Sequence, residues 1–244
     1  TCCCDHLEEQ LLPLSSWGKS YIAPKSYDRG AEKDVWRVLA SKPDTVISLS
    51  PAVTQIPTLQ PGEFFEFQAG DHLYISANEP ILVGQFLASE NAPNPDNDTC
   101  QSGFPFGTCK NGFLDICTKN TDCGNIEMPG DAGIGDPAFT FMIPAEQFRD
   151  EYLFLVPDKY ASDYASFVAV QGAVVTLDGS PLDEASAELV GNSGWVTYRV
   201  PLADGVHRVS SEQPLGAYVY GYDSFVSYGY PAGANVVIIN TDGI

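Results

Sequence analysis

The histidines are the first residues with chemical potential, because an imidazole can act as a general base or bind a metal. The chain has three of them, His6, His72 and His207. His72 and His207 lie at similar points of two similar segments, which favours a structural role over an active site built twice. His6 lies beside acidic residues and cysteines, so a metal site is an alternative there to a surface position.

A hydrolase would need further groups around an imidazole. The chain contains no G-x-S-x-G nucleophile motif, although a Ser-His-Asp triad is defined by geometry and can escape a sequence search. Glycosidases need two carboxylates about 5 to 10 Å apart, and adjacent acids such as Glu8–Glu9 arise by chance among 32 Asp and Glu. Two similar pairs, Glu9-Gln10 and Glu146-Gln147, are interpreted as hydrogen-bond partners of the backbone. The sequence therefore predicts no catalytic residue.

One acidic loop has the composition of a calcium site. Its oxygen-bearing residues alternate with others, as at the start of a calcium-binding loop. An EF-hand would require Gly and Glu where this chain has Thr99 and Pro105. A different calcium loop and a solvated acidic loop both remain open, and no other cofactor is expected. The candidate ligands are Asn94, Asp96, Asp98 and Asp122.

A run of tyrosines near the end of the chain has two interpretations. Alternate residues of a strand point to the same face, so a row of stacked tyrosines could bind a protein or sugar rings. The inner face of a β-sandwich would produce the same pattern, and Phe86 at the matching place in the first half favours that core. The candidate partner-binding residues are Tyr218, Tyr220, Tyr222, Tyr228 and Tyr230.

The seven cysteines indicate a compartment. They fall into two groups whose spacing fits paired zinc ligands poorly. Disulfides are therefore expected, and with them an oxidising, extracellular or cell-surface location. The odd number leaves one thiol without an intramolecular partner, and the connectivity is open. The candidates are Cys2, Cys3, Cys4, Cys100, Cys109, Cys117 and Cys123.

Charge and hydropathy exclude several classes of partner. The chain has 12 Lys and Arg against 32 Asp and Glu, a formal net charge of -20. A surface for nucleic acid or anionic lipid needs clustered Lys and Arg, so neither is expected. Hydrophobic residues make up 44% of the chain, enough for a core, yet no apolar run is long enough to span a membrane.

The elements that must position these residues are predicted to be almost entirely β-strands. Short β-branched or aromatic runs, bounded by Pro and Gly, are typical of an antiparallel sandwich or barrel. Helical patterns are limited to a turn or two within 5–12 and 144–149. The expected strands cover 44–49, 64–67, 72–76, 81–87, 173–177, 194–200 and 215–222.

A weak internal repeat organises these strands. Segments resembling 20–24, 35–39 and 71–80 recur in the same order at 153–157, 165–169 and 205–214. Conserved order at a near-constant offset predicts related modules in tandem. We therefore expect an all-β fold of two antiparallel sandwich-like modules, which can share one core. The predicted units are 1–91, a disulfide-rich acidic insertion at 92–136, and 137–244.

Several motifs resemble the N-terminal domain of the IgGFc-binding protein family. These are the opening Cys4-Asp-His-Leu-Glu-Glu-Gln-Leu-Leu-Pro13 with Trp17-Gly18-Lys19 and Tyr21, then Gly135-Asp-Pro-Ala-Phe139 leading into Glu146-Gln-Phe-Arg-Asp150, and finally Val219-Tyr-Gly-Tyr-Asp-Ser-Phe225 with Ser227-Tyr-Gly-Tyr-Pro231. The resemblance covers nearly the whole chain except the cysteine-rich insertion. It implies a non-catalytic, extracellular binding or adhesion module that contacts a protein or a glycan. A secreted hydrolase with an unrecognised site and a structural spacer are the alternatives.

Overall fold

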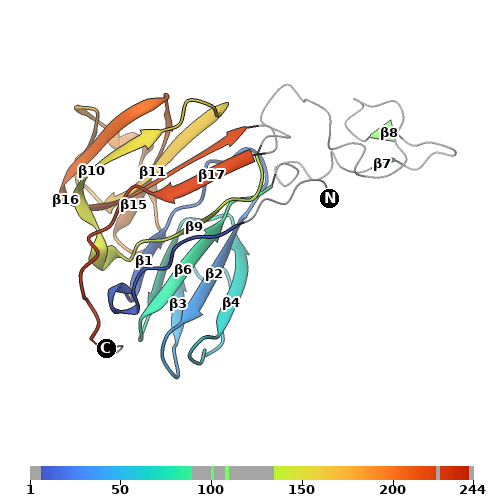
Figure 1. Ribbon diagram of the computed structural model, residues 1–244, viewed down its shortest axis with the longest axis vertical. Coiled ribbons are helices and arrows are strands. Elements are labelled where there is room, and N and C mark those ends of the chain that lie inside the picture. Colours follow the sequence, from blue (N-terminus) through green and yellow to red (C-terminus); the bar gives the residue numbers. More distant parts are fainter. Residues whose placement is uncertain (1–6, 90–99, 102–107, 110–134, 224–225, 242–244) are drawn as a thin grey trace.

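The computed structural model describes residues 7–89, 135–223 and 226–241, together with the backbone of 100–101 and 108–109. Within these residues the fold is all-β, and the strand pairings are antiparallel. The remaining segments are drawn as a thin grey trace in Figure 1.

The first half of the chain forms two sheets, in the orders β1-β5-β3 and β4-β2-β6-β9. β2 shows why its sequence forms a strand: its residues are alternately buried and half-buried, the period-two pattern of a sheet that packs on one face. The strands are β1 (Ser20–Ala23), β2 (Asp34–Ala40), β3 (Ile47–Ser50), β4 (Phe64–Ala69), β5 (Leu73–Ala77), β6 (Ile81–Phe86) and β9 (Phe139–Phe141), and a separate pair comprises β7 (Cys100–Gln101) and β8 (Thr108–Cys109).

The second half forms one sheet of eight strands around the long strand β16. The first part of β16 pairs with β10 and β12, and its later part pairs with β11 and β17. In Figure 1 these yellow to red strands lie above the blue and green strands of the first half. The strands are β10 (Arg149–Val156), β11 (Ser162–Val170), β12 (Val175–Leu177), β13 (Ser180–Pro181), β14 (Glu188–Leu189), β15 (Trp195–Leu202), β16 (Gly205–Asp223) and β17 (Val226–Pro231).

Both halves contain the same pattern of strand pairing. β5 pairs with β1 and β3, as the first part of β16 pairs with β10 and β12. The order β4-β2-β6-β9 likewise matches β15, β11, the later part of β16, and β17.

A buried tyrosine makes the same hydrogen bonds in each half. The hydroxyl of Tyr21 accepts from Gly18 N at 3.3 Å and donates to Ile81 O at 2.5 Å. The hydroxyl of Tyr152 accepts from Arg149 N at 3.0 Å and donates to Leu215 O at 2.7 Å. Tyr152, Arg149 and Leu215 therefore provide fixed points for comparing the two halves residue by residue.

Helical structure in the described part of the chain is limited to short 3-10 turns. η1 (Leu14–Ser16) and η4 (Ala145–Gln147) each follow a proline, and η5 (Glu184–Ser186) lies in the second half. The turn predicted within 144–149 is thus confirmed as η4. The turn predicted within 5–12 is wrong for 7–12, where the structure has neither helix nor strand.

One strand crosses the predicted boundary between the modules. β9 lies within 137–244, the range predicted for the second module, but it pairs with β6 of the first half. Phe139 lies opposite Phe86, and their rings stack with centroids 4.5 Å apart. Pairing therefore assigns β9 to the sheet of the first half, although the predicted insertion separates β9 from its partner β6 in the sequence.

The largest core cluster contains buried residues of both halves. Ile22 and Trp36 of the first half are 0% exposed and belong to the same cluster as Val168 and Tyr218 of the second. A second cluster is confined to the second half and includes Phe167. The two halves are therefore joined by a continuous apolar core as well as by the chain.

Candidate functional site: the charged cleft between the halves

A cleft of about 480 Å³ lies where the two halves meet. The first half contributes the loop after β1, Pro51 directly after β3, and the turn between β4 and β5. The second half contributes β14, β15 and the turn that separates them. The lining residues are Lys25, Asp28, Pro51, Gly70, Asp71, His72, Glu188, Leu189, Gly191 and Arg199.

Arg199 connects the two walls of this cleft. Its Nε and Nη2 donate to the two carboxylate oxygens of Glu188 at 2.8 and 2.9 Å. Its Nη1 donates to Asp28 Oδ2 at 2.8 Å and to Ser26 O at 3.1 Å, both in the first half. Burial by itself would lower the pKa of Arg199, but the two carboxylates raise it. The guanidinium is thus a fixed positive charge that ties β15 to the loop after β1.

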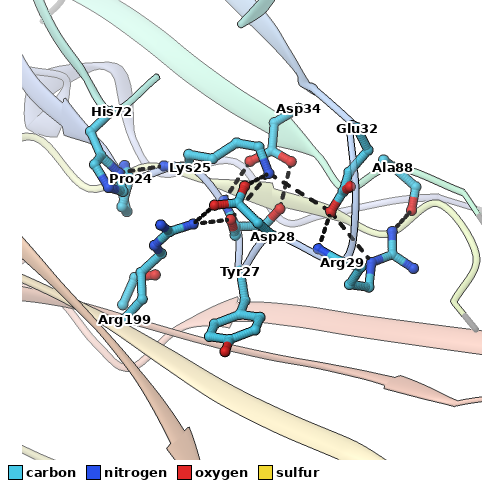
Figure 2. A network of polar contacts seen from close by, with 12 residues as sticks. Pro24, Lys25, Tyr27, Asp28, Arg29, Glu32, Asp34, His72, Ala88 and Arg199 are labelled. Atoms are coloured by element: carbon cyan, nitrogen blue, oxygen red, sulfur yellow. Dashed lines mark hydrogen bonds and ion pairs between the residues drawn. The ribbon is translucent and has the colours of Figure 1, made fainter. Parts of the chain in front are cut away.

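Lys25 extends the network into the protein, as Figure 2 shows. Its side chain is 2% exposed, and its Nζ lies 3.1 Å from Asp28 Oδ1 and 3.9 Å from Glu32 Oε1. Burial would raise the pKa of Asp28, but Arg199 and Lys25 outweigh it and lower that pKa. The buried Lys25 and the half-buried Arg199 thus keep Asp28 ionised at the rim of the cleft.

Asp34 anchors the same loop from beneath. Its carboxylate accepts from Ser26 N at 2.7 Å, from Ser26 Oγ at 2.6 Å and from Gln85 Nε2 at 2.6 Å. Burial raises the pKa of Asp34, and the nearby Lys25 charge opposes that rise. Because Asp34 lies in β2 and Gln85 in β6, this carboxylate fastens the cleft loop to the sheet.

His72 forms the inner wall of the cleft. Its Nδ1 accepts from the backbone N–H of Lys25 at 3.0 Å, and its Nε2 lies 3.4 Å from Glu188 Oε2. Burial lowers the pKa of His72, although Glu188 acts in the opposite direction. Both ring nitrogens are therefore engaged, and the imidazole is favoured in its neutral form.

His207 lies elsewhere and does not match His72. Its Nδ1 is 2.6 Å from Asp178 Oδ2 and its Nε2 is 2.8 Å from Ala203 O. Burial would lower the pKa of His207, but these two partners raise it. Its position in the register corresponds to that of Leu73. Leu73 lies opposite Ala23, two residues after Tyr21, and His207 lies opposite Phe154, two residues after Tyr152. The interpretation that the two histidines are equivalent is thus wrong by one residue, and His6 lies outside the described residues.

The opposite pKa shifts of the two histidines predict opposite effects of pH on stability. A histidine whose pKa is lowered by folding stabilises the protein above its unfolded value and loses that contribution as the pH falls. Replacing His72→Gln should therefore flatten the decrease in unfolding free energy between about pH 7 and pH 5. Chemical denaturation across this range measures the slope.

His207→Gln is the matched control. Its raised pKa contributes stability below the unfolded value that is lost as the pH rises, so this replacement should make the acid-side decrease steeper. The pKa values of Asp28 and Glu188 are lowered from their ordinary values of 3.8 and 4.5. These two carboxylates therefore titrate below the pH range in which the histidine variants are compared. Equal slopes in the two variants would contradict the assignment.

The structure places three of the predicted tyrosines in the interior. Tyr218, Tyr220 and Tyr222 are 3%, 5% and 1% exposed. The hydroxyl of Tyr218 accepts from Ile143 N at 3.1 Å, and that of Tyr220 accepts from Tyr27 N at 2.9 Å. These three rings present no face to a partner. The interpretation that they bind a protein or sugar rings is therefore corrected, and they belong to the core instead.

Tyr228 and Tyr230 are half-buried and lie on β17. The hydroxyl of Tyr228 donates to Asp163 Oδ1 at 2.6 Å, and the two rings stack with centroids 6.1 Å apart. Burial is the main cause of the raised pKa of both side chains. Their role in partner binding stays a prediction.

The predicted metal and disulfide residues lie outside the described side chains. This holds for Asn94, Asp96, Asp98 and Asp122 and for all seven cysteines, so calcium binding and disulfide formation stay predictions. Cys100 and Cys109 lie opposite each other in the backbone pairing of β7 and β8. Among the residues that the structure does describe, no group of three or more His, Cys, Asp or Glu is arranged to hold a metal ion.

The two Glu-Gln pairs both bond to backbone, but they reach different parts of it. Gln147 Nε2 donates to Ser16 O at 3.2 Å and to Val237 O at 2.8 Å, and Glu146 Oε1 accepts from Lys19 N at 3.1 Å. The predicted role of this pair is confirmed. Glu9 Oε1 accepts from Gln10 N at 2.9 Å and Gln10 Nε2 donates to Leu11 O at 3.4 Å, so this pair also bonds to backbone, although only to immediate neighbours. The equivalence of Gln10 with Gln147 is wrong, because the proline-initiated turn of Gln147 matches that of Ser16.

The family model for the IgGFc binding protein matches residues 1–221. The chain belongs to the IgGFc-binding protein family. The human IgGFc-binding protein is 35% identical over 82 residues, which are 33% of this chain and 2% of the human protein. This chain therefore corresponds to a small fraction of that relative.

The other comparisons add less about the family's fold. An anti-sigma factor domain-containing protein of known structure aligns over 82% of this chain and 77% of its own, with 10% identity and a TM-score of 0.19, a value too low to assign a shared fold. No helix in the described ranges is long and apolar enough to cross a membrane.

The sequence did not reveal the charged cleft of this family member. Lys25 and Asp28 lie close together in the chain, as do Glu188 and Arg199, but 171 residues separate Asp28 from Arg199, and the four residues form no recognisable motif. The available signal was indirect. Charged residues make up 18% of the chain, and one of the few lysines, Lys25, directly follows the apolar run 21–23 and a proline. Spacing along the sequence cannot show that Arg199 approaches this lysine, because their contact depends on how the halves pack.

Proposed function

We propose that this chain is a non-catalytic, protein-binding module of an extracellular or cell-surface protein, and that the partner docks at the charged cleft. Membership of the IgGFc-binding protein family over residues 1–221 carries this proposal. The cleft adds a location, because it is an open, charged depression whose walls are held rigid by internal ion pairs. Preorganised polar groups bind a partner with little further ordering.

The proposal also treats the two halves as related β-modules in tandem. The matching pairing orders and the matching hydrogen bonds of Tyr21 and Tyr152 support it. The first module then includes β9, and the predicted insertion lies within it, between β6 and β9. The cleft is the seam between the modules, so a partner bound there would contact both.

The charges of the cleft favour a basic partner. Asp71 is exposed at the rim, and the side chains of Asp28 and Glu188 are 53% and 42% exposed. The cations Lys25 and Arg199 lie deeper, with side chains 2% and 14% exposed. With a net charge of -20 for the chain, complementary positive charge on the partner would speed association and set its orientation.

The engaged imidazoles support binding rather than hydrolysis as the proposal. Each nitrogen of His72 faces a backbone N–H or Glu188, and each nitrogen of His207 faces Asp178 or Ala203 O. A general base must reach the proton that it removes. These contacts would have to break before either ring could act.

Binding to arrays of extracellular proteins and of glycans tests the proposal. We expect a protein ligand whose affinity falls by about tenfold or more when Asp71→Lys places a like charge against it. Asp158→Lys is the matched control, because Asp158 is also exposed but does not line the cleft. Interferometry with both variants at one salt concentration gives the comparison.

Three results would count against the proposal. No ligand on either array would remove the binding function. A glycan ligand without a protein ligand would change the partner class. Equal affinity of the two variants would place the site away from the cleft.

A further inference from the structure

The two halves contact each other through different faces. The β1 face of the first half carries Ile22 and Tyr74, which point away from the core residue Tyr21 and its neighbour Ile75 because side chains alternate along a strand. It packs near the β11 face of the second half, whose residues are Tyr164, Ser166, Val168, Tyr218 and Tyr220.

Contacts across this junction are direct. The ring of Tyr27, just beyond β1, stacks on Tyr164 with centroids 4.3 Å apart. Ser50 Oγ accepts from Asn192 N at 3.3 Å. Ile22 is 0% exposed and shares a core cluster with Val168 and Tyr218. The junction is therefore heterologous: a β1-type face of one module covers a β11-type face of the next.

The second half has its own β1-type face, and nothing in the described part of the chain covers it. Matching Tyr21 with Tyr152 makes Leu153 the counterpart of Ile22. Leu153, Leu155 and Val206 are 68%, 58% and 65% exposed. Leu155 lies opposite Val206 in the pairing of β10 with β16, so the three side chains form one apolar patch, here named the β10 face.

The first half has the corresponding β11-type face, which Trp17 covers at the end that carries Leu82 and Phe141, and which the described residues leave open at the Phe64 end. Matching Ile81 with Leu215 makes Phe86 the counterpart of the buried Tyr220. This β2 face carries Val35, Arg37, Phe64, Phe86 and Phe139, and Phe64 is 56% exposed. The guanidinium carbon of Arg37 lies 4.8 Å from the Phe64 ring centre and 4.9 Å from that of Phe86.

We propose that a second copy of this chain docks its β10 face on the β2 face of the first, repeating the junction between the halves. Each copy has one unused face of each type, so the contact does not close on itself, and heterologous contacts of this kind build open rows. β10 carries Leu153 and β4 carries Phe64. In Figure 1, β10 lies at the upper left and β4 at the lower right, so the two faces are well separated in space. The proposal rests on the equivalence of the halves and is independent of any ligand at the cleft.

Charge makes this self-association dependent on salt. Each face carries one ion pair: Arg208–Glu151 on the β10 face, where Arg208 lies opposite Leu153, and Arg37–Glu66 on the β2 face. The net charge of -20 opposes the approach of two copies. Screening weakens this long-range repulsion and leaves apolar burial unchanged, so added salt should strengthen the contact.

Sedimentation of the full chain tests the proposal. We expect the weight-average mass to rise by about twofold between about 10 and 500 µM, a concentration range that includes contacts weaker than the micromolar limit of standard-size interfaces. The mass should rise further in about 0.5 M NaCl. Leu153→Asp disables the β10 face and Phe64→Asp disables the β2 face, both at exposed positions. Val46→Asp, at a residue 51% exposed outside both faces, is the matched control and should behave as the unaltered chain.

Mixing the two disabled variants distinguishes this arrangement from a symmetric dimer. Each variant alone should remain monomeric, but an equimolar mixture should form dimers, because one intact β10 face meets one intact β2 face. A monomeric wild type at every concentration would overturn the proposal. So would association of either variant alone, or a mixture that stays monomeric.

Discussion

Replacing Ile22→Asp should abolish most of the stability of the protein, whereas the same replacement at its counterpart, Leu153→Asp, should leave the fold intact. Ile22 is 0% exposed within the core shared by the two halves, and Leu153 is 68% exposed. Loss of a buried aliphatic side chain costs about 2 to 5 kcal/mol. A polar group placed there without partners costs about 1 to 3 kcal/mol more.

The expected difference between these two variants is therefore about 3 to 8 kcal/mol, a large share of the roughly 5 to 15 kcal/mol that stabilises a typical domain. Denaturant unfolding followed by tryptophan fluorescence measures it, since Trp36 and Trp195 belong to or pack against the same core cluster. Near-equal midpoints for the two variants would show that the halves do not share a core. The result for Leu153→Asp also verifies that the self-association variant is folded.

Much of the strand structure was predictable because it depends on the local alternation of apolar and polar residues. β4, β5 and β6 were expected at 64–67, 72–76 and 81–87, close to where they occur. Sequence also predicted that the run containing Tyr218, Tyr220 and Tyr222 shares one face. It could not decide between surface and core, because that depends on whether another layer covers the face.

The register of the repeat was less accessible to sequence. Matching Glu-Gln with Glu-Gln placed Gln10 against Gln147, whereas the structure gives a proline-initiated turn to Ser16 and Gln147 alike. The signal that fixes the register is the pair of buried hydroxyls of Tyr21 and Tyr152. A single tyrosine has no distinguishing pattern in a chain with 12 of them, so the hydrogen bonds were needed to identify this pair.

The cleft was not predictable for a different reason. Its charges come from the loop after β1, the β4–β5 turn, β14 and β15. Each charge taken alone is consistent with a solvated surface residue. Only the packing of one half on the other places Arg199 within hydrogen-bond distance of Asp28 and makes Lys25 a buried cation.

The loop that carries these charges should be highly sensitive to the loss of Asp34. In Asp34→Ala, three donors from Ser26 and Gln85 lose their acceptor in a site that is 0% exposed. Removing one member of a buried charged network costs about 3 to 5 kcal/mol, because the remaining polar groups stay buried without partners. Asp158→Ala is the control, since Asp158 is exposed and its backbone lies outside the left-handed region, and its replacement should cost less than about 1 kcal/mol.

The pH dependence of this loss gives an independent check. Burial raises the pKa of Asp34, so the folded protein holds its proton to higher pH than the unfolded chain. A raised folded pKa contributes stability at acid pH that is lost as the pH rises through that value. The difference between wild type and Asp34→Ala should therefore shrink with rising pH. A difference that instead grows with pH would show that the attraction of Lys25 for the ionised carboxylate outweighs its desolvation.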